Sequence, residues 1–71
     1  MTLPHLKRRL GRKIRTLRED RGMSQIALAL ASGMSPARVN EIENAKAEAR
    51  ISSLARIADA LGVELTALFR A

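Results

Sequence analysis

The stretch SQIALALASGMSPARVNEIE, residues 24–43, contains two short helix-like runs separated by SGMS. Ser24 suits the N-cap of the first run and Ser35 that of the second, because a serine hydroxyl accepts a hydrogen bond from a free backbone N–H at a helix start. Pro36 follows at the first helical position, where a missing N–H costs nothing. Gly33 suits the turn between the runs. Two helices joined by a turn of about three or four residues form a helix-turn-helix, and the stretch predicts this motif.

The rest of the chain also predicts helices. Alanine is abundant, β-branched residues are few, and no segment alternates apolar and polar residues with a period of two. We expect helices over about residues 6–21, 25–32, 36–44, 51–61 and 65–69, with a loop over residues 45–50. The inward residues are expected to be Leu6, Leu10, Ile14 and Leu17 in the first helix, Leu28, Val39 and Ile42 in the next two, and Ile51, Leu54, Ile57, Ala58 and Leu61 in the fourth.

Length and charge limit the function further. A chain of 71 residues forms one small domain, and we expect that domain to fill residues 1–71, with residues 1–5 as a mobile N-terminal arm. The formal net charge is +6 and the pI is about 11.4. Such a charge indicates an anionic partner, nucleic acid first and an acidic membrane second. Eight of the 13 Lys and Arg residues lie in the first third of the chain.

The sequence offers little for catalysis or metal binding. Cysteine is absent and His5 is the only histidine, so no second such residue builds a nucleophile or a metal site. We expect neither an enzyme nor a cofactor. The lack of cysteine suits a reducing, cytoplasmic location. No apolar run reaches the roughly 18 residues that a membrane span needs.

The chain resembles the Cro- and phage-repressor-like helix-turn-helix domains, the XRE family of bacterial and phage regulators. The resemblance covers about residues 10–69 and rests on LGRKIRTLREDRGMSQIALALASGMS, VNEIENAK and LARIADALGVELTALF. It implies an all-α, compact five-helix domain of the lambda-repressor-like class. It also implies binding of double-stranded operator DNA, usually as a dimer, with no catalysis, no cofactor and no membrane.

The resemblance places the DNA-binding residues on and beside the third helix. It implies base reading by Ser35, Pro36, Ala37, Arg38, Asn40 and Glu41, and phosphate contacts from Ser24, Gln25, Asn44, Lys46 and Arg50. The physics of a helix N-terminus agrees for the second helix, since its free N–H groups attract anions. We expect Arg38 and Asn40 to be the hydrogen-bonding readers. The resemblance further implies a buried ion pair between Arg18 and Glu43.

The third helix ends in a way that departs from the family. Ala45 stands where relatives usually have glycine, and Ala49 replaces the proline common in the following loop. A left-handed alanine costs about 1 kcal/mol. This cost favours a third helix that continues past Ala45 for part of a turn, and it leaves the geometry of the loop over residues 45–50 open.

Two functions remain open. The first is a sequence-specific transcriptional regulator, such as a phage repressor, a restriction–modification controller or a stand-alone factor. The basic first helix, Gln25 and Arg38 favour it. The second is a protein-binding module, such as an antitoxin or adaptor with secondary DNA binding. It is favoured by acidic Glu41 and by Ile26 and Leu30, read as a partner surface. The alternative for these two apolar residues, which we favour, is isolated surface positions or packing against the Met1–Leu3 arm.

The C-terminal residues predict a dimer. Leu65, Leu68 and Phe69 form one apolar stripe near the chain end, and part of it must cover the fourth helix. A two-fold contact would bury Phe69 against its symmetry mate, because an isologous patch meets itself. Two recognition helices about 34 Å apart meet successive major grooves. We therefore expect a homodimer, joined through these three residues, on a palindromic operator.

Overall fold

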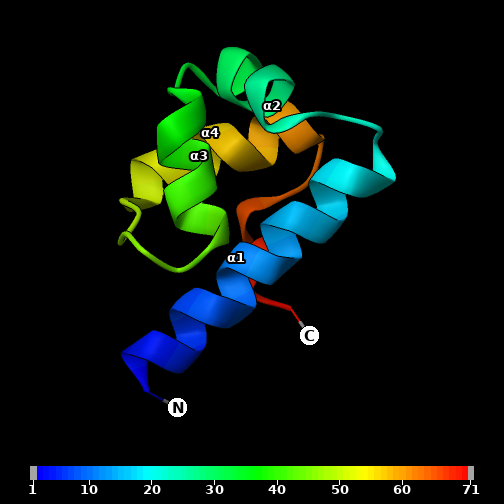
Figure 1. Cartoon of the computed structure of the whole chain (residues 1–71). Helices are drawn as coiled ribbons and strands as arrows, with labels where there is room; N and C mark the ends of the chain where they lie inside the picture. The colour runs from blue at the N-terminus through cyan, green and yellow to red at the C-terminus, as the bar shows by residue number, and fades with distance from the viewer. Residues whose placement is uncertain (1, 71) are drawn as a thin grey trace.

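The computed structural model describes residues 2–70, which fold into four α-helices and a short 3₁₀ helix (Figure 1). The elements are α1 (Leu3–Asp20), α2 (Gln25–Ser32), α3 (Pro36–Glu43), α4 (Ile51–Leu61) and η1 (Leu65–Phe69). α2, α3 and α4 cluster together, and α1 runs obliquely beside them with its N-terminal turns projecting away (Figure 1). The all-α class agrees with the sequence.

The fifth expected α-helix is a 3₁₀ helix. Leu65–Phe69 is only five residues long and has no side-chain cap at Glu64. Such short segments commonly adopt the tighter 3₁₀ geometry. Leu68 anchors the segment, with 1% of its surface exposed. It is therefore a core residue, and its expected place in a dimer interface is wrong.

The first helix begins earlier than the sequence analysis expected. The Thr2 hydroxyl accepts a hydrogen bond from the His5 N–H at 3.2 Å, and Pro4 lies in the first turn. Threonine caps and prolines in the first turn both favour a helix start. Residues 3–5 are thus the first turn of α1 rather than an arm, and Met1 lies outside the described residues.

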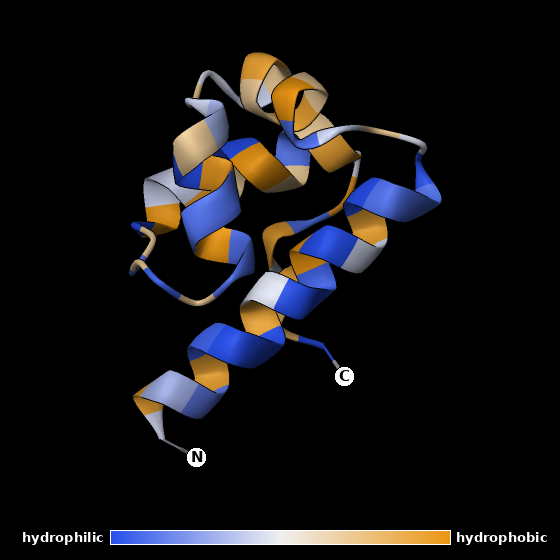
Figure 2. Ribbon diagram, in the orientation of Figure 1, coloured by the Kyte–Doolittle hydropathy of each residue, from blue (hydrophilic) through white to orange (hydrophobic). Residues whose placement is uncertain are grey.

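The core lies where α1, α2, α3, α4 and η1 meet. Figure 2 shows apolar residues recurring among hydrophilic ones along α1. The buried apolar residues are Ile14, Leu28, Ala29, Val39, Ile42, Leu54, Ile57, Ala58, Leu61 and Leu68. Ile51, expected to face inward, is 72% exposed, because it is the first residue of α4 and lies at the edge of the core.

A glycine within a helix brings α1 against the end of α3. Gly11 is buried, and a Cβ atom there would overlap the carbonyl oxygen of Glu43 and lie 2.6 Å from that of Ile42. Real Cβ atoms do not approach oxygen so closely. The sequence analysis assigned no role to Gly11 and missed this close crossing.

α3 ends at Glu43 in a left-handed turn. Ala45 has φ +59°. Its N–H donates to the Ile42 carbonyl at 3.2 Å, and the Lys46 N–H donates to the Glu41 carbonyl at 2.8 Å, which is the Schellman pattern. The expectation that α3 continues past Ala45 is wrong, because these two hydrogen bonds hold the chain in the turn despite the cost to alanine.

Candidate nucleic-acid interface

Two serine caps set the directions of α2 and α3. The Ser24 hydroxyl accepts from the Ala27 N–H at 3.0 Å, and the Ser35 hydroxyl accepts from the Arg38 N–H at 3.1 Å. Gly33 closes α2 with φ +71°. The two helices therefore meet in a tight turn, as the sequence predicted, and α3 presents one side to solvent.

A buried ion pair fixes the end of α3 to α1. Arg18 donates from Nε to Glu43 Oε2 at 2.7 Å and from Nη2 to Oε1 at 3.0 Å. Its Nη1 donates to the Met23 carbonyl at 2.8 Å. The hydrogen bond that Arg18 donates to Glu43 raises the pKa of Arg18 above its ordinary value, with burial acting in the opposite direction. The ion pair implied by the resemblance is present, and among the described residues no buried side-chain nitrogen or oxygen lacks a partner.

Gln25 connects this ion pair to the exposed side of α3. Its Nε2 donates to Glu43 Oε1 at 3.1 Å, and its Oε1 accepts from Asn40 Nδ2 at 3.3 Å. A carboxylate only accepts, so the amide nitrogen of Gln25 must face Glu43 and its oxygen must face Asn40. Asn40 consequently keeps an amide oxygen and a second N–H for a ligand. A carboxamide of this kind pairs with N6 and N7 of adenine.

Arg38 takes part in a contact that the sequence analysis did not foresee. Its Nη2 donates to the Glu48 carbonyl at 2.7 Å, and the residue is half-buried. The guanidinium thereby holds the loop of residues 45–50 against α3. Nothing in the local sequence pattern signals this contact, because the two residues come together only through the left-handed turn at Ala45.

The remaining expected DNA-binding residues lie on an open surface. Ser35, Pro36, Ala37, Asn40, Glu41 and Asn44 are exposed on α3 and its ends, and Lys46 and Arg50 are exposed on the loop. Asn44 Nδ2 donates back to the Asn40 carbonyl at 2.9 Å. We call the exposed side of α3 together with the start of α2 the α3 face. The structure thus gathers most of the expected site on one side.

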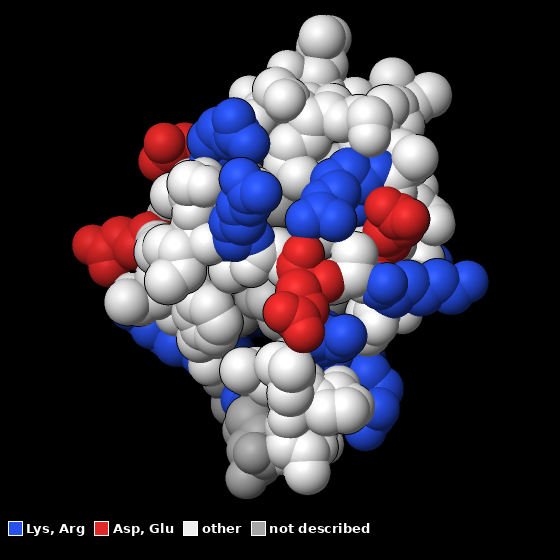
Figure 3. All heavy atoms as spheres, turned by 90° about the vertical axis from the view of Figure 1, so that its left-hand side faces the viewer, with Lys and Arg blue, Asp and Glu red and all other residues white. Residues whose placement is uncertain are grey.

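The net positive charge of the molecule does not come from the segment that carries the α3 face. Residues 24–50 carry three cations (Arg38, Lys46 and Arg50) and three acids (Glu41, Glu43 and Glu48), so they balance. Residues 51–71 carry two of each sign. Figure 3 shows Lys and Arg side chains interspersed with Asp and Glu on the side that includes α3. The whole surplus of +6 falls within residues 1–23, which carry eight cations and two acids.

Among residues 2–70, the exposed large apolar residues fall into two groups. On α2, Ile26 and Leu30 are 67% and 83% exposed. They do not pack against the start of α1, because α2 lies at the opposite end of the molecule (Figure 1). The second group, Leu3, Ile51 and Phe69, lines a groove of about 200 Å³. The sequence analysis singled out Phe69 for a dimer contact but did not single out Leu3 or Ile51.

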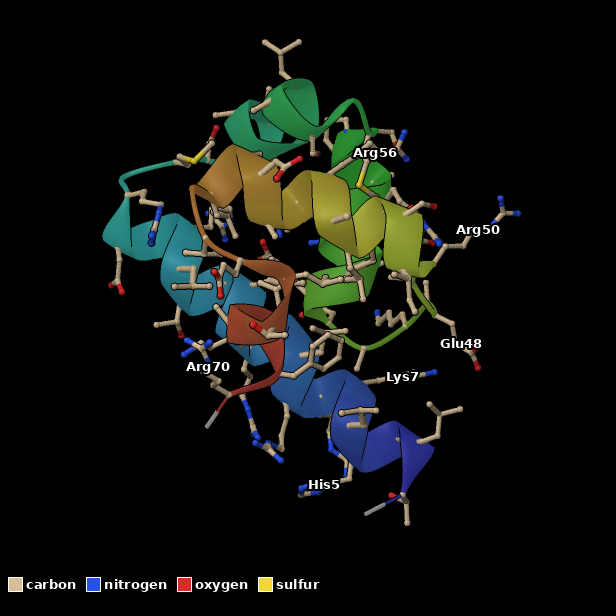
Figure 4. All side chains as sticks on the ribbon, turned by 180° about the vertical axis from the view of Figure 1, so that it is seen from behind. His5, Lys7, Glu48, Arg50, Arg56 and Arg70 are labelled. Carbon is tan, nitrogen blue, oxygen red and sulfur yellow. The ribbon has the colours of Figure 1, made fainter. Side chains whose placement is uncertain are left out.

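The groove has a charged rim. Lys7 and Glu48 both line it. Figure 4 shows these two side chains on the same edge of the molecule. The groove therefore has an apolar floor that is bordered by one cation and one acid.

Two classes of site find no candidate among residues 2–70. No group of three or more His, Cys, Asp or Glu residues in this range is placed to hold a metal ion. Within the same range, no helix has the length and apolar character needed to cross a membrane.

The comparisons with known proteins agree with this geometry. A family model described as helix-turn-helix matches residues 14–68. The chain is 39% identical over 57 residues to the HTH-type transcriptional regulator RamB of Mycobacterium tuberculosis, a match that covers 80% of this chain but only 12% of RamB. It therefore spans a small part of that relative.

Solved structures also match. The restriction–modification controller protein C.AhdI from Aeromonas hydrophila superposes with a TM-score of 0.88 at 30% identity, covering 89% of this chain and 96% of that one. An HTH_3 family transcriptional regulator from Vibrio cholerae gives a TM-score of 0.91 at 31% identity, covering 96% of this chain and 38% of that one.

Proposed function

The chain belongs to the HTH_3 family of XRE-type helix-turn-helix proteins, and from that membership we propose that it is a DNA-binding transcriptional regulator. Its α3 face enters the major groove of duplex DNA. The observation that carries the proposal is the hydrogen-bonded series from Arg18 through Glu43 and Gln25 to Asn40. This series of hydrogen bonds runs from the buried core to the surface of α3 and orients the exposed carboxamide of Asn40. Recognition of a DNA base by hydrogen bonds requires a side chain held in this way.

We assign base reading to the centre of the α3 face. Asn40 presents its free amide groups to adenine, and Glu41 can accept from N4 of cytosine. Ala37 and Pro36 offer apolar contact to a thymine methyl group. Ser35 lies at the start of the same surface. Arg38 holds the loop from the flank, so its contribution to recognition is to position the loop.

Phosphate contacts surround this centre. The N-terminus of α2 offers free N–H groups beside Ser24 and Gln25, and Lys46 and Arg50 are exposed on the loop. Asn44 lies between them. These groups fix the protein on the backbone and carry no sequence information themselves.

The experiment is selection of bound duplexes from a random pool, followed by binding of two variants to the selected site. Asn40→Ala should lose about 1–3 kcal/mol on that site and relax the preference at one base pair. Lys46→Ala, the matched control, should weaken selected and random duplexes alike. Equal binding of the selected site by the wild type and Asn40→Ala would reject α3 as the reading element.

We further propose that the protein binds as a homodimer on a palindromic site. The groove with Leu3, Ile51 and Phe69 on its surface would be the contact, and Lys7 of each copy would face Glu48 of the other across the two-fold axis. Leu65 is half-buried against the core and does not line the groove. The apolar exposure of the groove residues supports this arrangement.

A second candidate function is binding of another protein through α2. Ile26 and Leu30 are four residues apart and strongly exposed, so they form one apolar strip on the outer side of that helix. Replacing both with serine should leave operator binding intact and abolish binding of such a partner. Loss of operator binding in this variant would assign the strip to the DNA complex instead.

A further inference from the structure

The charge pattern of α1 works against the stability of the helix. Lys7, Arg8 and Arg9 lie in its first half, and Glu19 and Asp20 lie in its last turn. A helix dipole favours the reverse arrangement, with acids near the N-terminus and bases near the C-terminus. Like charges three or four residues apart also repel. A pattern that costs stability points to a binding role for these cations.

Two adjoining rows of cations run along α1, and Arg12 lies between them because it is four residues after Arg8 and three before Arg15. Arg8 and Arg15 lie three residues before and four residues after Gly11, so they share the side that faces α3. The second row is Arg9, Arg12 and Lys13, which line a shallow hollow of about 330 Å³ together with Thr16 and Arg70. Figure 4 shows Arg70 at the opposite edge of the molecule from Glu48 and Arg50.

This hollow carries four positive charges and one hydroxyl and no acidic lining residue. Arg70 has an acidic neighbour, Glu64, at 3.8 Å, but both side chains are mostly exposed. Residues 9–16 span about 10 Å of helix, a length over which a duplex carries about six phosphate charges. The size, openness and charge of the hollow match a stretch of nucleic-acid backbone.

We propose that this hollow, which we call the α1 hollow, binds the phosphates of a second DNA segment, so that one protein links two duplexes. The inference rests on the proposed function in so far as the α3 face holds the first segment. Arg12, Lys13 and Arg70 contact phosphate oxygens, and the Thr16 hydroxyl donates to one of them. No base is read there, so the second segment has any sequence.

The test uses two triple variants of equal charge change. Arg12→Gln/Lys13→Gln/Arg70→Gln removes three of the four positive charges of the α1 hollow. Arg8→Gln/Arg15→Gln/Lys46→Gln removes two cations on the side of α1 that faces α3 and one on the loop of residues 45–50. One assay measures the affinity for a single short duplex by fluorescence anisotropy. The other measures capture of a free labelled duplex by a bead-bound duplex that is saturated with protein.

The α1-hollow variant should bind a single duplex within about twofold of the wild type and lose capture of the second duplex by about tenfold or more. The control variant should instead lose single-duplex affinity by about tenfold or more. Arg12→Gln/Arg70→Gln changes only exposed side chains and should show a smaller loss of capture in the same direction.

Three results would overturn the inference. The first is a wild-type protein that binds one duplex but captures no second duplex, and the second is an α1-hollow variant that captures the second duplex as well as the wild type does. The third is binding of phosphatidylserine vesicles that depends on these residues while capture of DNA does not. Failure of the proposed function gives a different result, because neither the selected nor a random single duplex would then bind to the α3 face.

Discussion

At the scale of single residues, Ala45 sits in a conformation that glycine adopts freely. With φ at +59°, Ala45→Gly should raise the free energy of unfolding by about 1 kcal/mol, because the steric strain outweighs the entropy that glycine adds to the unfolded chain. Ala47→Gly is the control, since Ala45 is the only non-glycine residue with positive φ among residues 2–70. Urea unfolding measures both, and a loss of stability at each position would contradict the assigned turn.

The Arg18–Glu43 pair predicts a larger effect. Glu43→Ala should lower the free energy of unfolding by about 2–4 kcal/mol, mostly because a buried guanidinium loses its partner. Glu19→Ala breaks the exposed pair with Arg15, whose atoms are 3.6 Å apart and whose side chains are each 57% exposed. That change should cost less than about 1 kcal/mol. Similar losses in the two variants would show that the buried pair contributes no more than a surface pair.

Gln25 allows the hydrogen-bonded series to be separated from a phosphate contact. If Gln25 orients Asn40, Gln25→Ala should weaken the selected site more than a random duplex, because Asn40 loses its partner. A phosphate contact alone would weaken both duplexes equally. Anisotropy titrations on the two duplexes at one salt concentration decide between these roles.

At the scale of elements, the crossing of α1 and α3 depends on Gly11. Gly11→Ala improves helix propensity by about 1 kcal/mol, but the added methyl group meets backbone oxygens that cannot rotate away. We expect a net loss of about 1–3 kcal/mol in the free energy of unfolding. Thr16→Ala, on the exposed side of α1, should change stability by less than about 0.5 kcal/mol. A stabilised Gly11→Ala would mean that the two helices lie farther apart.

The helices themselves could be predicted because their signals are local. Ser24, Ser35 and Pro36 determine the helix starts through the backbone next to them, and the apolar spacing identifies most of the core. The contacts that shape the site are not local. Gly11 meets α3, Gln25 reaches Asn40 and Arg38 reaches the loop only after the chain has folded, so no local sequence pattern indicates these contacts.

At the scale of the whole molecule, the groove predicts a charge-dependent dimer. At micromolar concentration, sedimentation should give a dimer for the wild type and a shift toward monomer for Phe69→Ala. Lys7→Glu should also favour monomer, because it places like charges opposite each other, and Lys7→Glu/Glu48→Lys should restore the dimer. Ile26→Ala is the control on the other apolar surface. A wild-type protein that sediments as a monomer and binds its DNA as a single copy would contradict the proposed dimer.

Because the whole net positive charge lies within residues 1–23, the molecule also has a large electric dipole moment. In the field of a duplex the protein should turn its α1 side toward the DNA before any contact forms, and it must then rotate to seat α3. Long-range attraction acts on encounter and is screened by salt. Raising the ionic strength should therefore slow association steeply, as stopped-flow measurements at several salt concentrations would show. An Arg12→Gln/Lys13→Gln variant should associate more slowly at low salt and at the wild-type rate at high salt.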